Sequence, residues 1–478
     1  MAPISSPELQ AVMTTETSGS RAEDAGIGGG WFSCLEAEGG ADYTDAVAAT
    51  ILHPRETFGD TSRAGTWFAG LAFPESPIEH AVFWSIAGQY VLYFLGLAPI
   101  APLLTAGPVI ALAAVRIFRG RMVPHWLAML WFGCMAGVLL EMLAVFGLKG
   151  VGGWYVPGWL LTFGLAAFLP MAGPLVRPAV VFSAVTVLGV QTLLYAGLAR
   201  SAVAAGFDPQ YPSPIPVVRM IDPAFNVVRL TQARELAGSE SRLLAFTPFP
   251  TSAGAVACVF GLLTLGQRRS WWKGAALAGW LALLVLAVSR TAMIAGALGG
   301  ALYFLLRRRR RHLLLAGGSA LLLLAACTGP LLHGADSAYQ FVRDRRPSSS
   351  QDRTNLRSLA WEGWRYGDDP VLGAGVSVRG GPIVRDVGIG THDTLGANFF
   401  MRGALGFGLT MLPVLVTLVF GFFAGRSPLE RVVTAVCAML LVYAYSQEWQ
   451  TLYVHIWPAF LIVGALGARA RNPEPAAP

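Results

Sequence analysis

Charged residues are scarce in this sequence. Asp, Glu, Lys and Arg make up 13% of the 478 residues, about half of the roughly 25% found in soluble domains. Hydrophobic residues reach 54% and the mean hydropathy is +0.54. Apolar runs of roughly 17 to 25 residues recur, the length an α-helix needs to cross a bilayer. The short alternating segments of a porin-type barrel are missing. The sequence therefore predicts a helical membrane protein.

Motifs for several common functions are also missing. The five cysteines form no CxxC pair and four of them lie inside apolar runs, which argues against a disulfide framework or a zinc site. No GxxxxGK[ST] loop is present, so we expect no ATP binding. Residues 1–30 contain neither the basic region nor the apolar core of a signal peptide. We expect no cofactor, no metal and no nucleic-acid partner.

The hydrophobic profile predicts an all-α polytopic fold with about twelve transmembrane helices. The expected spans are 80–97, 99–117, 124–147, 156–175, 178–199, 250–266, 272–288, 291–306, 313–333, 400–423, 430–447 and 451–468. The expected parts of the chain are a mostly disordered tail (1–79), spans one to nine with an outer loop (80–333, loop 200–249), a large helical loop (334–399), spans ten to twelve (400–468) and a second tail (469–478).

The distribution of basic residues predicts the orientation. Every second loop, beginning with the one after span two, is short and contains arginine or lysine. The positive-inside rule places these loops, and with them both tails, in the cytoplasm. The long loops at 200–249 and 334–399 then face outward.

The longest polar stretch of the C-terminal half, 335–400, contains eight arginines. Arginine binds phosphate groups in bidentate geometry, so this stretch could bind an anion beside the membrane. Arg290, in the Ser289-Arg290-Thr291 junction, lies at the expected outer start of span eight. Two interpretations stay open for it: an interface-anchoring arginine or a phosphate ligand.

A helix is predicted to begin at Ser348–Ser350 within this stretch. Arg353, Arg357 and Trp361 fall on one face of it, at spacings of four residues. A basic and aromatic face suits either a lipid pyrophosphate or an interface belt, whereas a lone surface arginine is more often merely solvated. A second helix is expected to begin after Thr391 and to run into span ten.

Single polar residues add further candidates. His392 lies in the outer loop close to a span, where a neutral imidazole could accept a proton from a sugar hydroxyl, or serve only as a structural loop residue. Arg242 leads from the outer loop 200–249 into span six. Glu141 in span three and Glu448 at the outer end of span eleven are membrane carboxylates, which are usually paired or functional.

Together these motifs resemble those of one known family. The order is Arg242, Ser289-Arg290-Thr291, Arg357 with Trp361, Pro370 to Gly375, His392, and the glycine-rich start of span ten at Gly403 to Gly408. Over roughly residues 240–425 the chain resembles the O-antigen ligase and polymerase superfamily of bacterial envelope glycosyltransferases. Members of that family transfer glycans from undecaprenyl pyrophosphate at the outer face of the cytoplasmic membrane.

The resemblance implies roles for individual residues. Arg290 and a loop arginine would bind the pyrophosphate; Arg357 fits the Arg-x3-Trp pattern, and Arg353 competes with it. His392 would be the base that activates the acceptor hydroxyl. The family often has Asn after this histidine, where Asp393 stands here, and the start of span six lacks the usual Asn-Pro. These departures put the acceptor in question more than the donor chemistry.

The resemblance therefore implies a bacterial inner-membrane transferase with an outward-facing site. Its expected partners are an undecaprenyl-pyrophosphate-linked glycan donor, a glycan or glycolipid acceptor, and the bilayer. Glu141, Asp393, Glu448 and Trp361 would contact or support the acceptor. Direct displacement of the pyrophosphate would invert the anomeric carbon and requires no metal in principle. The second hypothesis is a transporter or flippase of an anionic lipid or solute, and a scaffold ranks third.

Overall fold

The computed structural model describes residues 70–98, 100–151, 155–214, 227–232, 242–307, 347–367, 369–375, 378–379, 388–389, 394–424, 427–445 and 450–469. The chain divides into two units, 1–61 and 62–478, and everything below concerns the second unit.

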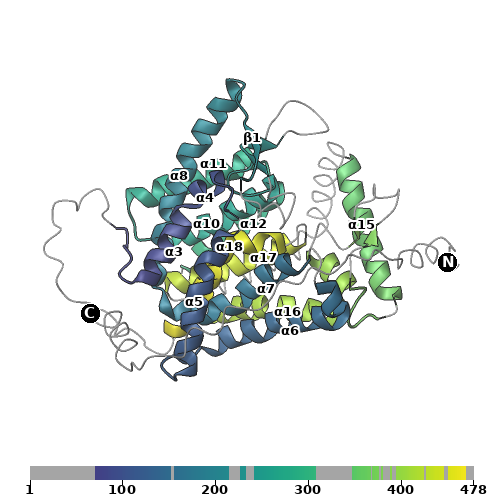
Figure 1. Cartoon of the computed structure of the whole chain (residues 1–478). Helices are drawn as coiled ribbons and strands as arrows, with labels where there is room; N and C mark the ends of the chain where they lie inside the picture. The colour runs from purple at the N-terminus through teal and green to yellow at the C-terminus, as the bar shows by residue number, and fades with distance from the viewer. Residues whose placement is uncertain are drawn as a thin grey trace, which may run out of the picture. The chain divides into compact units, whose positions relative to one another are not determined.

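Helices dominate this unit (Figure 1). The helices are α3 (Pro77–Ala87), α4 (Gln89–Phe94), α5 (Ala101–Phe118), α6 (Trp126–Val151), α7 (Tyr155–Ala172), the 3-10 turn η1 (Gly173–Leu175), α8 (Pro178–Ala204), α10 (Pro250–Leu265), α11 (Trp271–Ala287), α12 (Arg290–Leu306), α15 (Pro347–Tyr366), α16 (Thr394–Ala424), α17 (Pro428–Ala444) and α18 (Gln450–Arg469). This confirms the all-α class, including the helix predicted near Ser348 and the one predicted after Thr391.

The prediction of twelve spans was wrong. By length and apolar composition, four helices in the described ranges can cross a membrane: α5, α6 over Trp126–Val145, α8 and α16. Three other apolar helices are shorter: α10 has 16 residues, and α11 and α12 have 17 each. At about 1.5 Å per residue these reach about 24–26 Å, less than the roughly 30 Å of a hydrocarbon core. The predicted span at 313–333 lies outside the described residues.

Two of the predicted spans are also interrupted. The expected 80–97 span is divided at Gly88 into α3 and α4, and α16 has a break at Gly403. A hydropathy profile does not register such breaks, because a glycine leaves the apolar run unchanged.

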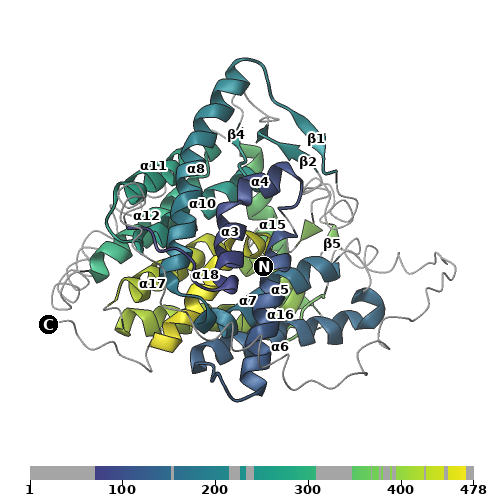
Figure 2. The same ribbon diagram turned by 60° about the vertical axis from the view of Figure 1, so that its left-hand side comes forward.

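The loop 200–249, which the sequence predicts to face outward, contains short strands that the sequence did not indicate. In sequence order, β1 (Gln210–Pro212) pairs antiparallel with β2 (Val227–Arg229), and β3 (Thr231–Gln232) with β4 (Arg242–Leu243). The β1–β2 pair lies beside the end of α8 (Figure 2). In the large loop, β5 (Val378–Arg379) pairs with β6 (Gly388–Ile389). Pairs of two or three residues are too short to leave a period-two pattern in the sequence.

Serine caps begin three of the helices. The side chains of Ser76, Ser270 and Ser427 accept hydrogen bonds from backbone amides three residues ahead, at the starts of α3, α11 and α17. At α17 the Glu430 carboxylate also accepts from the Ser427 amide at 2.7 Å, which completes a capping box. These contacts satisfy amides that a helix leaves without intrahelical partners.

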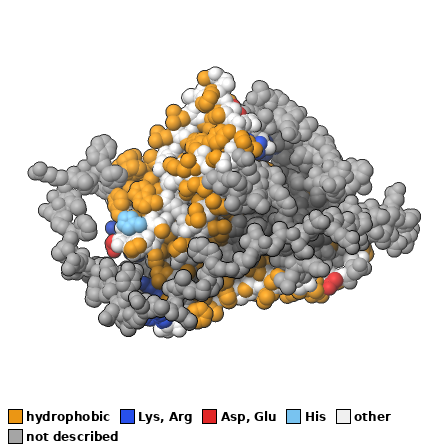
Figure 3. All heavy atoms as spheres, in the orientation of Figure 1, with side chains coloured by type: hydrophobic (Ala, Val, Ile, Leu, Met, Phe, Trp, Pro, Cys, Tyr) orange, Lys and Arg blue, Asp and Glu red, His pale blue; other side chains and the backbone are white. Residues whose placement is uncertain are grey.

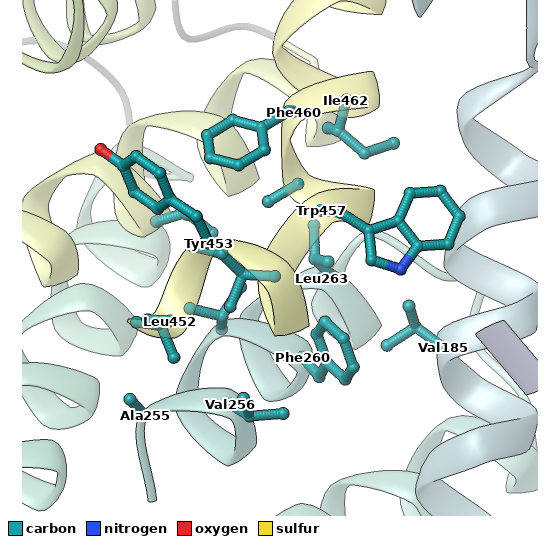
Figure 4. Close-up of a cluster of buried hydrophobic side chains, with 14 of the residues drawn as sticks. Val185, Ala255, Val256, Phe260, Leu263, Leu452, Tyr453, Trp457, Phe460 and Ile462 are labelled. Atoms are coloured by element: carbon teal, nitrogen blue, oxygen red, sulfur yellow. The ribbon is translucent and has the colours of Figure 1, made fainter. Parts of the chain in front are cut away.

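Helix α18 packs deep among the others. Figure 4 shows its side chains Tyr453, Trp457 and Phe460 close to Phe260 of α10 and Val185 of α8, and each of the five is at most 2% exposed. Such close contacts stabilise helix association by van der Waals attraction, which within a bilayer replaces the exclusion of water as the driving force.

In Figure 3 the described part of the face, over α3, α5 and α8, carries mostly hydrophobic side chains, and the few Lys, Arg, Asp and Glu side chains lie near the edges. Exposed apolar residues include Leu104 of α5 (64%) and Leu198 of α8 (73%). A soluble protein rarely presents so large an apolar face to water. The chain is therefore embedded in a membrane.

An ion pair joins the start of α3 to the start of α8. Arg177 donates hydrogen bonds to both carboxylate oxygens of Glu79, each at 2.8 Å, and also pairs with Glu75. The Glu79 side chain is 5% exposed and that of Arg177 is 42% exposed. Burial by itself would raise the pKa of Glu79, but the hydrogen bonds and charge of Arg177, together with the hydrogen bond from the Glu75 amide, outweigh it and hold that pKa below its usual value.

We predict that this pair makes stability depend on acid. Because the folded-state pKa of Glu79 is lowered, its contribution is fully present above the usual carboxyl pKa of about 4.3 and is lost as the pH falls through the folded value. The thermal midpoint of the detergent-purified protein should therefore fall more steeply below about pH 4.3 for the wild type than for Glu79→Gln. Equal slopes would contradict the assignment.

Candidate functional site

The starts and ends of several helices meet at one end of the bundle. Helices α12 and α17 run antiparallel, as two contacts show. A Cβ on Gly299 would lie 3.0 Å from the Ala435 oxygen, and the Arg431 guanidinium lies 5.7 Å from the centre of the Tyr303 ring, so a later residue of α12 meets an earlier residue of α17. In this register Arg290, the first residue of α12, is level with the last turn of α17. Arg290 is exposed there.

Arg357 of α15 lies at the same end. Its Nη2 donates to the carbonyl oxygen of Tyr445, just after α17, at 2.8 Å, and its guanidinium lies 4.1 Å from the centre of the Tyr445 ring. Arg290 and Arg357 are therefore both at the end of α17. The side chain of Arg353 lies outside the described set, although its backbone continues α15 one turn earlier.

The start of α10 joins this end. The Tyr443 hydroxyl donates to the Thr251 oxygen at 2.8 Å, and a Cβ on Gly254 would lie 2.5 Å from the Ser289 Cβ. Arg242, half-buried in β4, precedes α10 by eight residues. We call this part of the bundle, formed by the starts of α10 and α12 and the end of α17, the arginine end.

Arg229 of β2 also lies at the arginine end, and the sequence analysis did not select it. Its Nη2 donates to the Pro248 oxygen at 3.2 Å, and the Tyr93 hydroxyl donates to its carbonyl at 2.7 Å.

Aromatic side chains connect α15 to α16. Trp361, which is 48% exposed, lies 5.5 Å from Phe399, ring centre to ring centre, and Trp364 lies 4.9 Å from the same ring. Phe399 stacks on Phe407 at 4.0 Å. The first turns of α16 are thus held beside α15. His392 precedes α16 by two residues and lies outside the described residues, as do Asp393 and Glu448.

Helix α16 is broken at Gly403, whose φ of 60° and ψ of −163° only glycine adopts readily. The segment 370–375 fills the break. The amides of residues 404 and 405 donate to the oxygens of residues 370 and 371, and the amides of 374 and 375 donate to those of 400 and 401, at 2.8 to 3.1 Å. Four backbone bonds thus satisfy groups that the break would otherwise leave unpaired within the bundle.

A buried polar line precedes this break. Thr394, Asn398 and Arg402 are spaced four residues apart on α16, so they share a face, and their exposures are 0%, 0% and 2%. Both amide atoms of Asn398 are buried and make no hydrogen bond within the described part of the chain. Buried polar groups usually have partners, so this amide is suited to receive a polar group from a ligand.

Glu141 of α6 faces Arg402. A Cβ on Gly406 would lie 2.8 Å from Glu141 Oε2 and 2.9 Å from Arg402 Cδ, so both side chains pack on this glycine. The guanidinium of Arg402 also lies 4.4 Å from the centre of the Phe163 ring. The predicted membrane carboxylate Glu141 therefore has an arginine neighbour.

Helix α6 runs antiparallel to α16, because Trp131 Nε1 donates to Thr417 Oγ1 at 2.8 Å while Glu141 faces residue 406. Glu141 then lies about two turns before Lys149, the first charged residue that follows it in the sequence of α6. The polar line is therefore near the end of the apolar run of α6, on the side of the arginine end.

The candidates meet only in part within the described residues. Arg290, Arg357 and Arg242 share the arginine end. Trp361 lies on the adjoining α15, and Glu141 lies beside Arg402 of the buried polar line. Sequence reasoning missed Asn398 and Arg402, although a charge inside the predicted span 400–423 was a signal for Arg402.

No group of three or more His, Cys, Asp and Glu side chains able to hold a metal is gathered in the portion of the chain that the structure describes. The arrangement offers instead guanidinium groups for an anion and buried amide and carboxylate groups for hydroxyls. Comparison with models of known protein families and with curated proteins finds no match for this chain.

Proposed function

We propose that this protein is a membrane glycosyltransferase that moves a glycan from undecaprenyl pyrophosphate to an acceptor hydroxyl. The proposal places the arginine end on the outer face of a bacterial cytoplasmic membrane. The observation that carries it is the gathering of Arg290, Arg357 and Arg242, which come from three separate segments, at one end of the bundle.

Arginines at this end suit a diphosphate. Guanidinium groups form paired, charge-assisted hydrogen bonds with phosphate oxygens, and they stay charged near a membrane. They stabilise the negative charge that grows on the bridging oxygen as the sugar–phosphate bond breaks, where electrostatic stabilisation contributes most to the rate. The lipid tail of the donor would lie in the bilayer beside the bundle.

The reaction is a single displacement. The acceptor hydroxyl gives its proton to His392, and its oxygen bonds to the anomeric carbon. The bond from that carbon to the diphosphate oxygen breaks, and undecaprenyl pyrophosphate leaves with the electron pair. Attack from the opposite side inverts the anomeric configuration. A diphosphate is a good leaving group, so the proposed step uses no metal.

The buried polar line supplies a place for hydroxyl groups. Asn398 can donate to one hydroxyl and accept from another, and Glu141 Oε2 can accept a further bond. Because Arg402 offsets the charge of Glu141, the buried polar line suits an uncharged sugar more than a second anion. The acceptor can be a growing polysaccharide or a separate glycolipid.

A second function, transport of an anionic lipid or solute, is favoured by one observation. Broken helices and buried ionisable residues often mark substrate sites in transporters, and α16 combines the break at Gly403 with Arg402 and Glu141. We rank it second because Arg290 and Arg357 lie at the end of the bundle, whereas a transport path needs polar groups through the bilayer.

The proposal is tested by incubating the purified protein with a synthetic undecaprenyl-pyrophosphate oligosaccharide and analysing the products by mass spectrometry. We expect free undecaprenyl pyrophosphate together with a lengthened glycan or a glycosylated acceptor. Accumulation of intact donor inside protein-containing vesicles, with no new glycosidic bond, would instead establish transport and reject the transferase.

A further inference from the structure

A second cationic cluster lies at the other end of α12 and α17, away from the arginine end. Lys273 Nζ donates to the carbonyl oxygens of Leu265 at 2.7 Å and Gln267 at 3.0 Å. The Tyr303 hydroxyl donates to the same Leu265 oxygen at 3.0 Å, and Arg431 lies over the Tyr303 ring. Lys273 and Arg431 are thus gathered around one tyrosine and one carbonyl.

Arg307 adds a third positive charge. It follows Tyr303 by four residues, one helical turn, and is exposed. Lys273 lies close enough to Arg307 and Arg431 for their like charges to repel. The Nε of Arg431 is buried and donates to no acceptor within the described ranges. An anion at this position would relieve the repulsion and accept that hydrogen bond.

The neighbouring side chains place this cluster at the depth of lipid headgroups. Trp271 and Trp272, at the start of α11, lie with ring centres 4.3 Å apart, and Trp271 is 53% exposed. Tryptophans at helix ends are typical of the boundary between hydrocarbon and water. Their apolar rings would contact the glycerol and upper acyl chain of a bound lipid.

We propose that Lys273, Arg307 and Arg431 bind the phosphate of an anionic phospholipid headgroup. Basic pockets between helix ends bind such headgroups because phosphate oxygens accept several charge-assisted hydrogen bonds at once. A lipid is favoured over free phosphate because the cluster adjoins an exposed tryptophan. The site is independent of the proposed transferase chemistry, which lies at the other end of the same helices.

Native mass spectrometry tests this on the full-length protein from micelles containing equal amounts of phosphatidylglycerol and phosphatidylcholine. We expect retained phosphatidylglycerol, and a loss of roughly tenfold to thirtyfold in its binding for the Arg307→Gln/Arg431→Gln variant, at about 1 kcal/mol per removed charge. The control Arg119→Gln/Arg121→Gln, which removes the same charge from exposed arginines after α5, should bind as the wild type does.

Equal loss in the control would show diffuse attraction and overturn the site, as would retained binding in the Arg307/Arg431 variant. Displacement of the lipid by millimolar inorganic phosphate would assign the site to free phosphate and also overturn it. Arg431→Lys should keep most of the binding because it keeps the charge. If the double variant does not fold, Arg307→Gln alone should lose roughly fivefold, and no loss would reject the proposal.

Discussion

Replacing Gly403 with alanine should destabilise the protein by about 5–7 kcal/mol. A Cβ there would lie 2.2 Å from the carbonyl oxygen of Val371, and the backbone has a φ of 60°. The conformation alone costs about 1–3 kcal/mol for a residue other than glycine. Expelling the segment 370–375 would also break its four backbone hydrogen bonds to α16, worth about 1 kcal/mol each.

Gly408→Ala is the matched control for this change. It lies in the same helix, and nothing would lie within 4 Å of its added Cβ. Alanine in a regular helix is favoured over glycine by about 0.5–1 kcal/mol, so this variant should be equal to or more stable than the wild type. The two variants are compared by thermal unfolding in detergent, with the remaining monodisperse protein as the measured signal. Equal midpoints for both variants would show that the break at Gly403 is not needed.

Replacing His392 with alanine should reduce the rate of glycan transfer about a hundredfold or more. In the proposed reaction His392 removes the acceptor proton, and loss of a general base commonly lowers a rate by about 10²–10⁴-fold. The measurement is the initial rate of product formation from the lipid-pyrophosphate oligosaccharide by purified protein. A general base must be unprotonated to act, so the wild-type rate should fall as the pH is lowered.

His80→Ala provides the comparison for His392. His80 is exposed on α3, whose start is joined to the start of α8 through Glu79, and it has no role in the proposed reaction. This variant should transfer glycan at the wild-type rate. Full activity in His392→Ala, at an unchanged thermal midpoint, would remove His392 from the mechanism. The product analysis by mass spectrometry would then decide whether the protein is a transferase.

Much of the fold could be predicted from single residues and short patterns. Proline at the start of α8 and α10, and serine caps at α11 and α17, lie where the predicted helices begin. The Ser348–Ser350 signal located α15, and its four-residue spacing put Arg357 and Trp361 on one stretch of helix. These predictions succeed because they depend on hydrogen bonds and packing within a few residues.

The number of spans could not be predicted in the same way. Hydropathy counts apolar residues without regard to where a helix begins or breaks, so α3 and α4 were taken as one span. Asn398 and Arg402 were missed for a related reason. Each is an isolated polar residue, and their common face becomes visible only once the helix phase and the neighbouring Glu141 are known.

The sequence by itself determined that the chain is helical and membrane-embedded, because backbone groups in hydrocarbon must be bonded within the segment and the side chains around them must be apolar. The tertiary structure decided which polar groups meet. Arg290 and Arg357 share an end because α12 and α17 run antiparallel, and Glu141 meets Arg402 because α6 packs against α16 at Gly406. Such encounters between residues far apart in the chain depend on helix packing, which no local pattern encodes.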